Sequence, residues 1–364
     1  MNRRSALQAC LAAGASFVAS PALGKIAASH TTHELITSTI TIDMHSHIPP
    51  DATVAAFPIK AGMKQAGLDA ICASFPVDVV PRQAEGDWYK VYLDWVQQLK
   101  KLAKDSGIRE IKSLADLESC HRDRIPGVLQ ATEGAHFLEG RLERLATAYD
   151  GGLRHLQLAH SVQDPISPTG DLQTLTPQFD GLTSFGRSVI AECNRLGIVT
   201  DLAHSSGKTL KDALEVSSVP IIFSHTALLS PVGLGAVPTW ADNRLPMRLL
   251  RPDEAQAIAA AGGVIGVWHI FPTVSAYAAA ILDLVNTVGE DHVGIGSDTG
   301  IAGAIFNANH RWPGQHNGFL HAVVGELRKQ KCPPATIRKV IGQNYCRILR
   351  AVEQARDASH AART

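Results

Sequence analysis

The sequence has few cysteines, no excess of charge of either sign and no apolar run long enough to span a membrane. Its 364 residues include 6 Cys, and none of them forms a Cys-x-x-Cys pair, so neither a disulfide framework nor a thiolate zinc site is expected. Lys and Arg number 34 together, as do Asp and Glu. This zero balance provides no basic field of the kind that nucleic-acid binding needs, and we expect no nucleic-acid partner.

Histidine is the unusual part of the composition. The chain holds 16 His but only 4 Met, within an ordinary content of 45% hydrophobic and 19% charged residues. This content excludes disorder and a coiled coil. Because histidine is the commonest metal ligand, this content suggests a metal site, and the positions of the 16 His along the chain indicate where it would lie.

The N-terminus has the pattern of a cleavable export signal. Arg3 and Arg4 precede an apolar, small-residue stretch over 6–19 that ends in a cleavage-like segment at 20–24. The adjacent arginines resemble a twin-arginine signal, and a general secretory route stays open. We therefore expect residues 1–24 to be removed, residues 25–37 to form a linker, and the mature bacterial protein to lie in the periplasm without a membrane span.

Eight short apolar or β-branched runs alternate with helical patterns after this segment. The runs cover 38–44, 68–75, 127–131, 153–159, 197–203, 219–223, 263–268 and 293–296. Eight such repeats predict a single (β/α)8 TIM-type barrel over residues 38–353. A helical excursion is expected after the second strand, over 77–124, and a polar tail over 354–364.

In a barrel of this kind, chemistry takes place at the carboxyl ends of the strands. Histidines or carboxylates follow seven of the eight runs: His45, His47, Glu133, His160, His204, His225, His269 and Asp298. One histidine at a strand end is more often structural than a ligand. Their recurrence on separate strands predicts that they converge on one rim, with the role of His269 left undecided.

These residue types suit a pair of zinc ions. His45 and His47 are two residues apart on a strand, so both can point to the same side. Four histidines and one glutamate exceed what a single tetrahedral ion needs. We expect Glu133 to bridge two ions, with His45 and His47 on one and His204 and His225 on the other. Two ions about 3.5–4 Å apart could share a hydroxide and polarise a carbonyl, which predicts hydrolysis.

Taken in order, several segments resemble the membrane (renal) dipeptidases, zinc enzymes with a (β/α)8 fold that cleave dipeptides. The resemblance extends from about residue 39 to 352. Its segments are IDMHSH (42–47), ATEG (131–134), GLTSFGR (181–187), NRLG (194–197), DLAH (201–204), FSH (223–225), GGV (262–264) and HVGIGSD (292–298). Each segment alone is weak, but their order along the chain is specific.

The resemblance implies roles for individual residues. It assigns the metal ligands to His45, His47, Glu133, His204 and His225, with two Zn²⁺ per chain and Glu133 bridging them. It implies that Asp298 serves the proton transfers and that His160 contacts the substrate and the developing oxyanion. It also implies an arginine for the free carboxylate of a dipeptide, with Arg248 as the candidate and Arg244 as the reserve. A planar guanidinium fits that task because it binds a carboxylate through two hydrogen bonds.

The sequence also departs from the family pattern. His47 stands where the family usually carries Asp, which leaves Glu133 and Asp298 as the carboxylates of a more positive site. The stretch from His225 to Arg248 is longer than usual, and Thr299 follows Asp298 where an aromatic residue is common. These departures affect the prediction of dipeptide specificity more than the prediction of hydrolysis.

Other functions and assemblies stay open. One alternative is another amidohydrolase-type hydrolase that acts on N-acyl amino acids or lactones. Many such enzymes bridge their metals with a carboxylated Lys on the fourth strand, but 153–160 contains no Lys. A second alternative is a periplasmic tailoring protein without peptidase activity. The expected partner is a small molecule such as a dipeptide, and a homodimer remains open.

Overall fold

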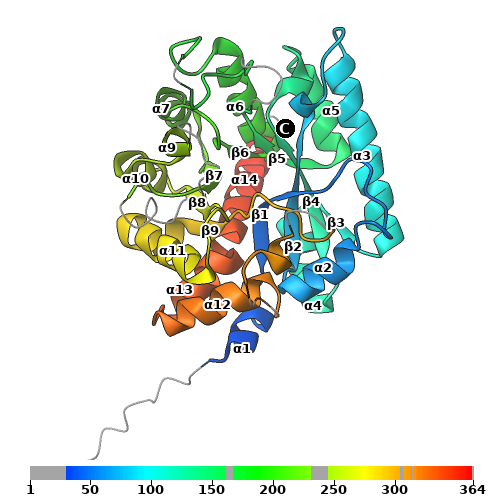
Figure 1. The fold of residues 1–364 in the computed structure, drawn as a ribbon. Coiled ribbons are helices and arrows are strands. Elements are labelled where there is room, and N and C mark those ends of the chain that lie inside the picture. Colours follow the sequence, from blue (N-terminus) through cyan, green and yellow to red (C-terminus); the bar gives the residue numbers. More distant parts are fainter. Residues whose placement is uncertain are drawn as a thin grey trace, which may run out of the picture. The chain divides into compact units, whose positions relative to one another are not determined.

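The strands run parallel in one sheet that curves into a barrel with helices around it (Figure 1). The computed structural model describes residues 30–160, 167–174, 176–230, 245–303, 307–313, 315 and 317–362. Eight strands follow one another in the order β1-β2-β4-β5-β6-β7-β8-β9, and β3 pairs with β4 outside this path. The predicted (β/α)8 fold class is confirmed.

The strands match the eight predicted runs and add a ninth. They are β1 (Ile42–His47), β2 (Ala70–Pro76), β3 (Arg109–Ile111), β4 (Gly127–Glu133), β5 (Leu153–Gln157), β6 (Val199–Asp201), β7 (Ile222–Thr226), β8 (Val264–Val267) and β9 (Val293–Ile295). Backbone hydrogen bonds close the barrel between β1 and the segment after β9. His47 N donates to Thr299 O at 3.0 Å, and Asp298 N donates to His45 O at 3.0 Å.

The helices of the described chain cover the outside of the barrel and its lower end. They are α1 (Thr32–Thr37), α2 (Ile59–Ala66), α3 (Asp87–Ser106), α4 (Leu114–Asp123), α5 (Glu143–Gly151), α6 (Ser184–Leu196), α7 (Gly207–Val216), α9 (Leu245–Arg248), α10 (Pro252–Ala260), α11 (Val274–Val288), α12 (Phe319–Lys329), α13 (Pro334–Arg338) and α14 (Asn344–Ala361). None of the helices described is both long enough and apolar enough for a membrane span. The five cysteines in the described part of the chain are free and buried.

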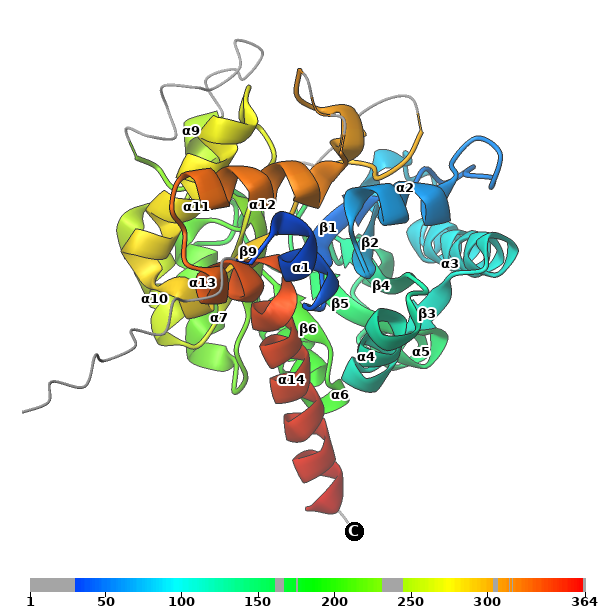
Figure 2. The same ribbon diagram turned by 90° about the horizontal axis from the view of Figure 1, so that it is seen from below.

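Three segments differ from the sequence expectation. Residues 77–124 are not a purely helical excursion, because β3 lies between α3 and α4 and pairs with β4. This strand has only three residues and exposes Glu110, so it lacks the apolar run that reveals the others. Thr32–Thr37, expected in a linker, forms α1, which lies beside α12 in both views (Figures 1 and 2). Residues 354–361, expected in a polar tail, continue α14.

The barrel interior packs around one methionine and around a backbone carbonyl that lies close to two glycines. Met44 of β1 lies against Gly266 of β8 and Gly294 beside it on β9. The carbonyl oxygen of Ser224 lies so close to Gly266 and Gly296 that a Cβ atom at either position would overlap it. The absence of side chains at these glycines therefore allows β7, β8 and β9 to pack closely next to the ligand-bearing end of the barrel.

Gly266→Ala is expected to destabilise the barrel because the new methyl group would overlap Ser224 O and the end of Met44. Overpacking of this kind costs at least about 1–3 kcal/mol. Urea or thermal unfolding monitored by circular dichroism measures the loss. Gly151→Ala, at an α5 position with no neighbouring atom within 4 Å of the added Cβ, is the matched control and should be neutral or slightly stabilising. Equal stabilities of the two variants would contradict the packing argument.

Candidate metal centre

The strand ends bring the predicted site residues together at one end of the barrel. His45 and His47 belong to β1, Glu133 ends β4, and His225 belongs to β7. His160 follows β5, His204 follows β6, and Asp298 follows β9. Arg248 ends α9, and the reserve candidate Arg244 lies outside the described residues.

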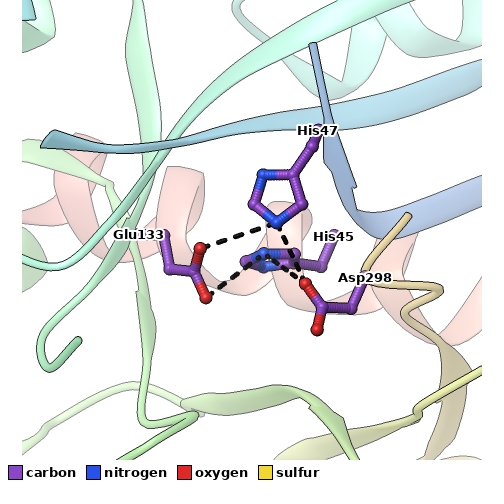
Figure 3. A group of neighbouring side chains, drawn as sticks. All are labelled: His45, His47, Glu133 and Asp298. Atoms are coloured by element: carbon purple, nitrogen blue, oxygen red, sulfur yellow. Dashed lines mark hydrogen bonds and ion pairs between the residues drawn. The ribbon is translucent and has the colours of Figure 1, made fainter. Parts of the chain in front are cut away.

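Four of these residues form a first group, shown in Figure 3. His47 Nε2 lies 3.0 Å from Asp298 Oδ1 and 3.6 Å from Glu133 Oε2. His45 Nε2 lies 3.7 Å from Glu133 Oε1 and 3.7 Å from Asp298 Oδ1. One atom from each residue can be chosen so that all four lie within 4.8 Å of one another. The group is thus compact enough to surround one ion.

A second group forms around the same glutamate. Glu133 Oε1 lies 3.1 Å from His204 Nε2, 3.5 Å from His160 Nε2 and 3.8 Å from His225 Nε2. His204 Nε2 and His225 Nε2 are 3.0 Å apart. The structure therefore places His160 as close to this position as the two predicted ligands. Glu133 belongs to both groups, which is the geometry that a bridging carboxylate requires.

The spacing and the unpaired atoms fit metal ions. A tetrahedral zinc ion with bonds of about 2.0–2.2 Å holds its ligand atoms roughly 3.4 Å apart. The nitrogen-to-oxygen distances around Glu133 range from 3.1 to 3.8 Å. His45 Nε2 is buried and has no hydrogen-bond partner among the described residues. A buried nitrogen without a partner costs free energy, and a metal ion at this position would satisfy it.

The electrostatics of the first group favour a positive charge on His47 and negative charges on the carboxylates. Burial alone would lower the pKa of His47, but the hydrogen bond to Asp298 and the charge of Glu133 raise it to about 9. Burial likewise opposes ionisation of Glu133, yet the charges of His160 and His45 hold the pKa of this carboxyl well below its ordinary value. The two carboxylates are therefore ionised at neutral pH and attract a proton or a divalent cation between them.

The histidines of the second group differ in charge. Burial and the charge of Arg248 lower the pKa of His204 to about 4, and burial with the charge of His45 lowers the pKa of His225 well below its ordinary value. Both are neutral, which is the form that binds a metal. For His160, burial lowers the pKa, but Glu133 and the 2.5 Å contact of Nδ1 with Asp78 Oδ1 outweigh it and raise the pKa. His160 is thus better suited to donate a hydrogen bond than to bind an ion.

Two further carboxylates, which were not predicted from the sequence, hold the strand ends in place. Asp43 accepts hydrogen bonds from His45 N at 3.2 Å, Ser297 N at 2.8 Å and Ser297 Oγ at 2.5 Å. Asp201 accepts hydrogen bonds from Ala203 N at 3.0 Å and Ser224 N at 2.9 Å. Each carboxylate therefore connects two strands of the barrel directly beneath the ligands. The one signal for them was a buried Asp inside an apolar run, two or three residues before a ligand.

His204 and Asp298 have strained backbones. Their φ angles are 68° and 55°, in the left-handed region that residues other than glycine seldom adopt. Such conformations persist only where the surrounding hydrogen bonds hold them, and they cluster at functional sites. The sharp turn at the end of each strand aims both side chains back across the rim of the barrel.

A serine orients two of the imidazoles. Ser224 Oγ lies 2.9 Å from His225 Nδ1 and 3.3 Å from His45 Nδ1, while Ser74 Oγ lies 3.2 Å from His45 Nδ1. These contacts occupy the Nδ1 atoms and leave both Nε2 atoms facing Glu133. Hydrogen bonding at the second ring nitrogen is how proteins fix the tautomer and orientation of a ligating histidine. No signal in the sequence distinguished this serine.

Arg248 lies against the second group. Its Nη2 atom lies 2.8 Å from His204 Nε2 and 3.5 Å from His225 Nε2, and its guanidinium carbon lies 4.8 Å from the centre of the Trp268 ring. Thr226 Oγ1 donates to the Arg248 carbonyl at 2.9 Å and fixes the backbone there. The helix-entry residue identified in the sequence thus faces the candidate site.

His269 takes no part in either group of candidate ligands. Its ring packs against Trp312, Phe319 and Tyr277, with ring centres 4.6, 5.2 and 5.8 Å away. Burial lowers its pKa to about 3, so it is a neutral member of this aromatic cluster.

Barrel and site together define an amidohydrolase-type (β/α)8 fold with a candidate metal centre at the carboxyl ends of its strands. The crystal structure of an amidohydrolase from Pseudomonas aeruginosa has this fold, with a TM-score of 0.73, 24% identity and coverage of 89% of this chain and 99% of that one. A metallopeptidase from Rhodobacter sphaeroides, crystallised with a phosphinate mimic of the dipeptide L-Ala-D-Ala, has a TM-score of 0.68, 20% identity and coverage of 86% and 99%.

The chain belongs to the membrane dipeptidase family (peptidase family M19), which matches residues 30–363. This confirms the resemblance identified from the ordered sequence segments. Dipeptidase 3 of Mus musculus is 28% identical over 301 residues, which are 79% of this chain and 57% of the mouse protein. The chain thus spans about half the length of the curated relatives it matches.

Ser224→Ala is expected to weaken zinc binding by about 10–100-fold, because His45 and His225 lose the hydroxyl that orients them. Competition with a zinc-sensitive chelator measures the affinity of each ion. Ser205→Ala is the matched control, since the Ser205 hydroxyl is buried nearby and has no hydrogen-bond partner among the described residues. The orienting role of Ser224 is wrong if the two variants bind zinc equally well.

Proposed function

We propose that this protein is a zinc-dependent dipeptidase with two Zn²⁺ per chain that share Glu133. The observation that carries the proposal is the position of Glu133, which is the member common to both groups of candidate ligands. Membership of the membrane dipeptidase family supports it, as does the dipeptide mimic bound to the structurally similar metallopeptidase. His45 and His47 would hold one ion, and His204 and His225 the other. When bound, the two ions would activate water and polarise the scissile carbonyl.

Asp298 provides the base of the reaction. Burial opposes its ionisation, but the hydrogen bond with His47 and the charge of that ring hold the pKa of this carboxyl well below its ordinary value. Asp298 is therefore a carboxylate at neutral pH and can accept a proton from the attacking water. The same carboxyl then passes the proton to the leaving amine.

His160 stabilises the negative charge that develops on the carbonyl oxygen. Asp78 holds its Nδ1 atom, and its Nε2 atom points toward Glu133 at 3.5 Å. The raised pKa of His160 favours the protonated ring, which can donate a hydrogen bond from Nε2. A donor aimed at the position where charge develops lowers the barrier because it needs no rearrangement during the reaction.

Arg248 binds the C-terminal carboxylate of the substrate. Its guanidinium stacks on Trp268 and lies beside His204 and His225. His204 in turn contacts Glu133. One lone pair of His204 Nε2 cannot bind both Arg248 and a metal ion, so the guanidinium becomes free for the substrate when the metal site is filled. Because Arg248 stands at a fixed position relative to the metal centre, it can bind the C-terminal carboxylate of a dipeptide but not that of a longer peptide.

The alternatives differ in how they would bridge two metals or in what they would bind at Arg248. A carboxylated lysine bridge is excluded on β5, whose sequence Leu153–Gln157 contains no Lys. A lactone has no carboxylate for Arg248 to bind. An N-acyl amino acid would present the same carboxylate, and a tailoring protein would retain the fold without hydrolysing peptides. Their substrates therefore serve as comparisons in the kinetic test.

The zinc-loaded protein is expected to hydrolyse L-Ala-L-Ala or L-Ala-D-Ala faster than N-acetyl-alanine or a lactone. Arg248→Ala should raise KM for the dipeptide by at least about tenfold and leave the C-terminally amidated dipeptide nearly unaffected, because the amide presents no carboxylate. Arg248→Lys should have a KM between those of the wild type and Arg248→Ala, since lysine keeps the charge but loses the planar guanidinium. Arg187→Ala on α6, an exposed arginine, is the control. Equal losses on both substrates would reject the carboxylate contact, and turnover of the lactone or N-acyl substrate alone would reject the dipeptidase.

Asp298→Asn is expected to lower kcat by about 10²–10⁴-fold while the protein keeps most of its zinc, because an amide cannot accept the proton. Single-turnover kinetics and zinc content by mass spectrometry measure the two effects separately. Asp94→Asn, at an exposed position of α3, should change neither. Undiminished turnover refutes the proton-transfer role, and loss of one ion would make Asp298 a ligand of the first group instead.

We also propose that the protein is exported to the periplasm. The support is the pattern of the sequence alone, with Arg3 and Arg4 before an apolar stretch over 6–19. These residues lie outside the described part of the chain. Fractionation of cells that express the full chain tests this placement.

A further inference from the structure

A cavity of about 690 Å³ opens beside the first group of candidate ligands. We name it the β1 cavity, and it is lined by His47, Ile48, Pro49, Pro50, Asp51, Ala52, Ala56, Phe57, Phe75, Pro76, Val79, Asp298, Thr299, Gly300, Ala302 and Gly303. The lining comes from the segments that follow β1, β2 and β9, which are neighbours around the barrel. Its volume is in the range of small-molecule sites, which is about 300–1,000 Å³.

The lining of the β1 cavity is mainly apolar, apart from the site residues, Asp51 and Thr299. Ile48, Phe57 and Phe75 are buried in its wall, and Val79 is 37% exposed at its side. His47 and Asp298 are the two site residues that line it. Among the described lining residues there is no Lys or Arg, and the acidic ones are Asp51 and Asp298. The cavity therefore offers contact area to an apolar group and no Lys or Arg to an acidic one.

The β1 cavity and Arg248 lie over different strands of the barrel. Arg248 contacts His204 after β6, His225 of β7 and Trp268 after β8. The cavity lies over β9, β1 and β2, and the order of strands places these two sets on different parts of the ring. The first group of candidate ligands contains His47 and Asp298 of the cavity wall. The second contains His204, which contacts Arg248, and Glu133 is common to both groups. A substrate with its carboxylate on Arg248 therefore directs its other end to the β1 cavity.

We propose that the β1 cavity binds the side chain of the N-terminal residue of the substrate and that this protein selects dipeptides whose N-terminal side chain is large and apolar, such as phenylalanine or leucine. The proposal rests on the proposed dipeptidase function. A glycine in this position would leave the cavity filled with water and would lose the burial of apolar area. An aspartate would place a second carboxylate near Asp51 in a lining that contains no Lys or Arg.

The test compares kcat/KM for L-Phe-L-Ala, L-Leu-L-Ala, Gly-L-Ala and L-Asp-L-Ala with the full zinc-loaded chain, so that the C-terminal residue stays constant. We expect the phenylalanine and leucine substrates to exceed Gly-L-Ala by at least about tenfold. L-Asp-L-Ala should be the poorest of the four. Equal values for all four substrates would overturn the proposal.

Two variants alter the cavity without touching a residue of the catalytic or metal machinery. Val79→Arg places a cation at its side and should lower kcat/KM for L-Phe-L-Ala by about tenfold while raising that for L-Asp-L-Ala. Ala56→Trp fills the space from an exposed position and should lower the value for L-Phe-L-Ala but leave Gly-L-Ala unchanged. Leu93→Arg is the matched control, since Leu93 is 39% exposed on α3 outside the cavity. Equal effects of a cavity variant on all substrates would contradict the proposal.

Failure of the proposed function gives a different result. If the wild-type protein hydrolyses none of the four dipeptides, the dipeptidase proposal fails, and calorimetric titration with the same four dipeptides then tests the cavity by itself. Tighter binding of L-Phe-L-Ala than of Gly-L-Ala, lost in Val79→Arg, supports the apolar site. Equal affinities, or a preference that survives in both cavity variants, overturn it.

Discussion

The buried carboxylate of Glu133 is the interaction on which the rest of the site depends. It lies within 3.8 Å of ring nitrogens from five histidines. A buried anion is costly unless positive charge compensates it, and the imidazoles around it cannot all be protonated without repelling one another. The charge divides accordingly, with His47 and His160 favoured as cations and His204 and His225 held neutral. Divalent ions on both sides of Glu133 would provide the same compensation without protons.

The hydrogen bonds that close the barrel also place the ligands. Asp43 joins β1 to Ser297 after β9, and Asp201 joins β6 to Ser224 on β7. Ser224 then contacts the Nδ1 atoms of His45 and His225. Its carbonyl oxygen lies against Gly266 on β8 and Gly296 after β9. Stability and ligand geometry therefore share the same atoms. This is why the strained backbones of His204 and Asp298 can persist at the strand ends.

The surroundings of the site differ in charge and polarity from one part of the rim to another. On one side Arg248 and Trp268 form a cationic, aromatic surface suited to a carboxylate. On the other side the segments after β1, β2 and β9 form an apolar cavity that reaches His47 and Asp298. A small substrate with one charged and one apolar end fits this arrangement in one direction only. That direction would place its central bond over Glu133, between the two groups of candidate ligands.

The sequence alone determined the architecture and most of the chemistry. Eight strand runs, seven of them followed by His, Glu or Asp, predict both the barrel and the rim where His45, Glu133, His204 and Asp298 meet, because parallel strands present their carboxyl ends on one side. Local periodicity did not reveal β3, whose three residues gain their stability from pairing with β4 rather than from an apolar run. The roles of Asp43 and Ser224, the closeness of His160 to Glu133 and the apolar wall beside His47 were decided by the tertiary structure alone. They depend on distances between residues far apart in the chain, and no spacing in the sequence encodes those distances.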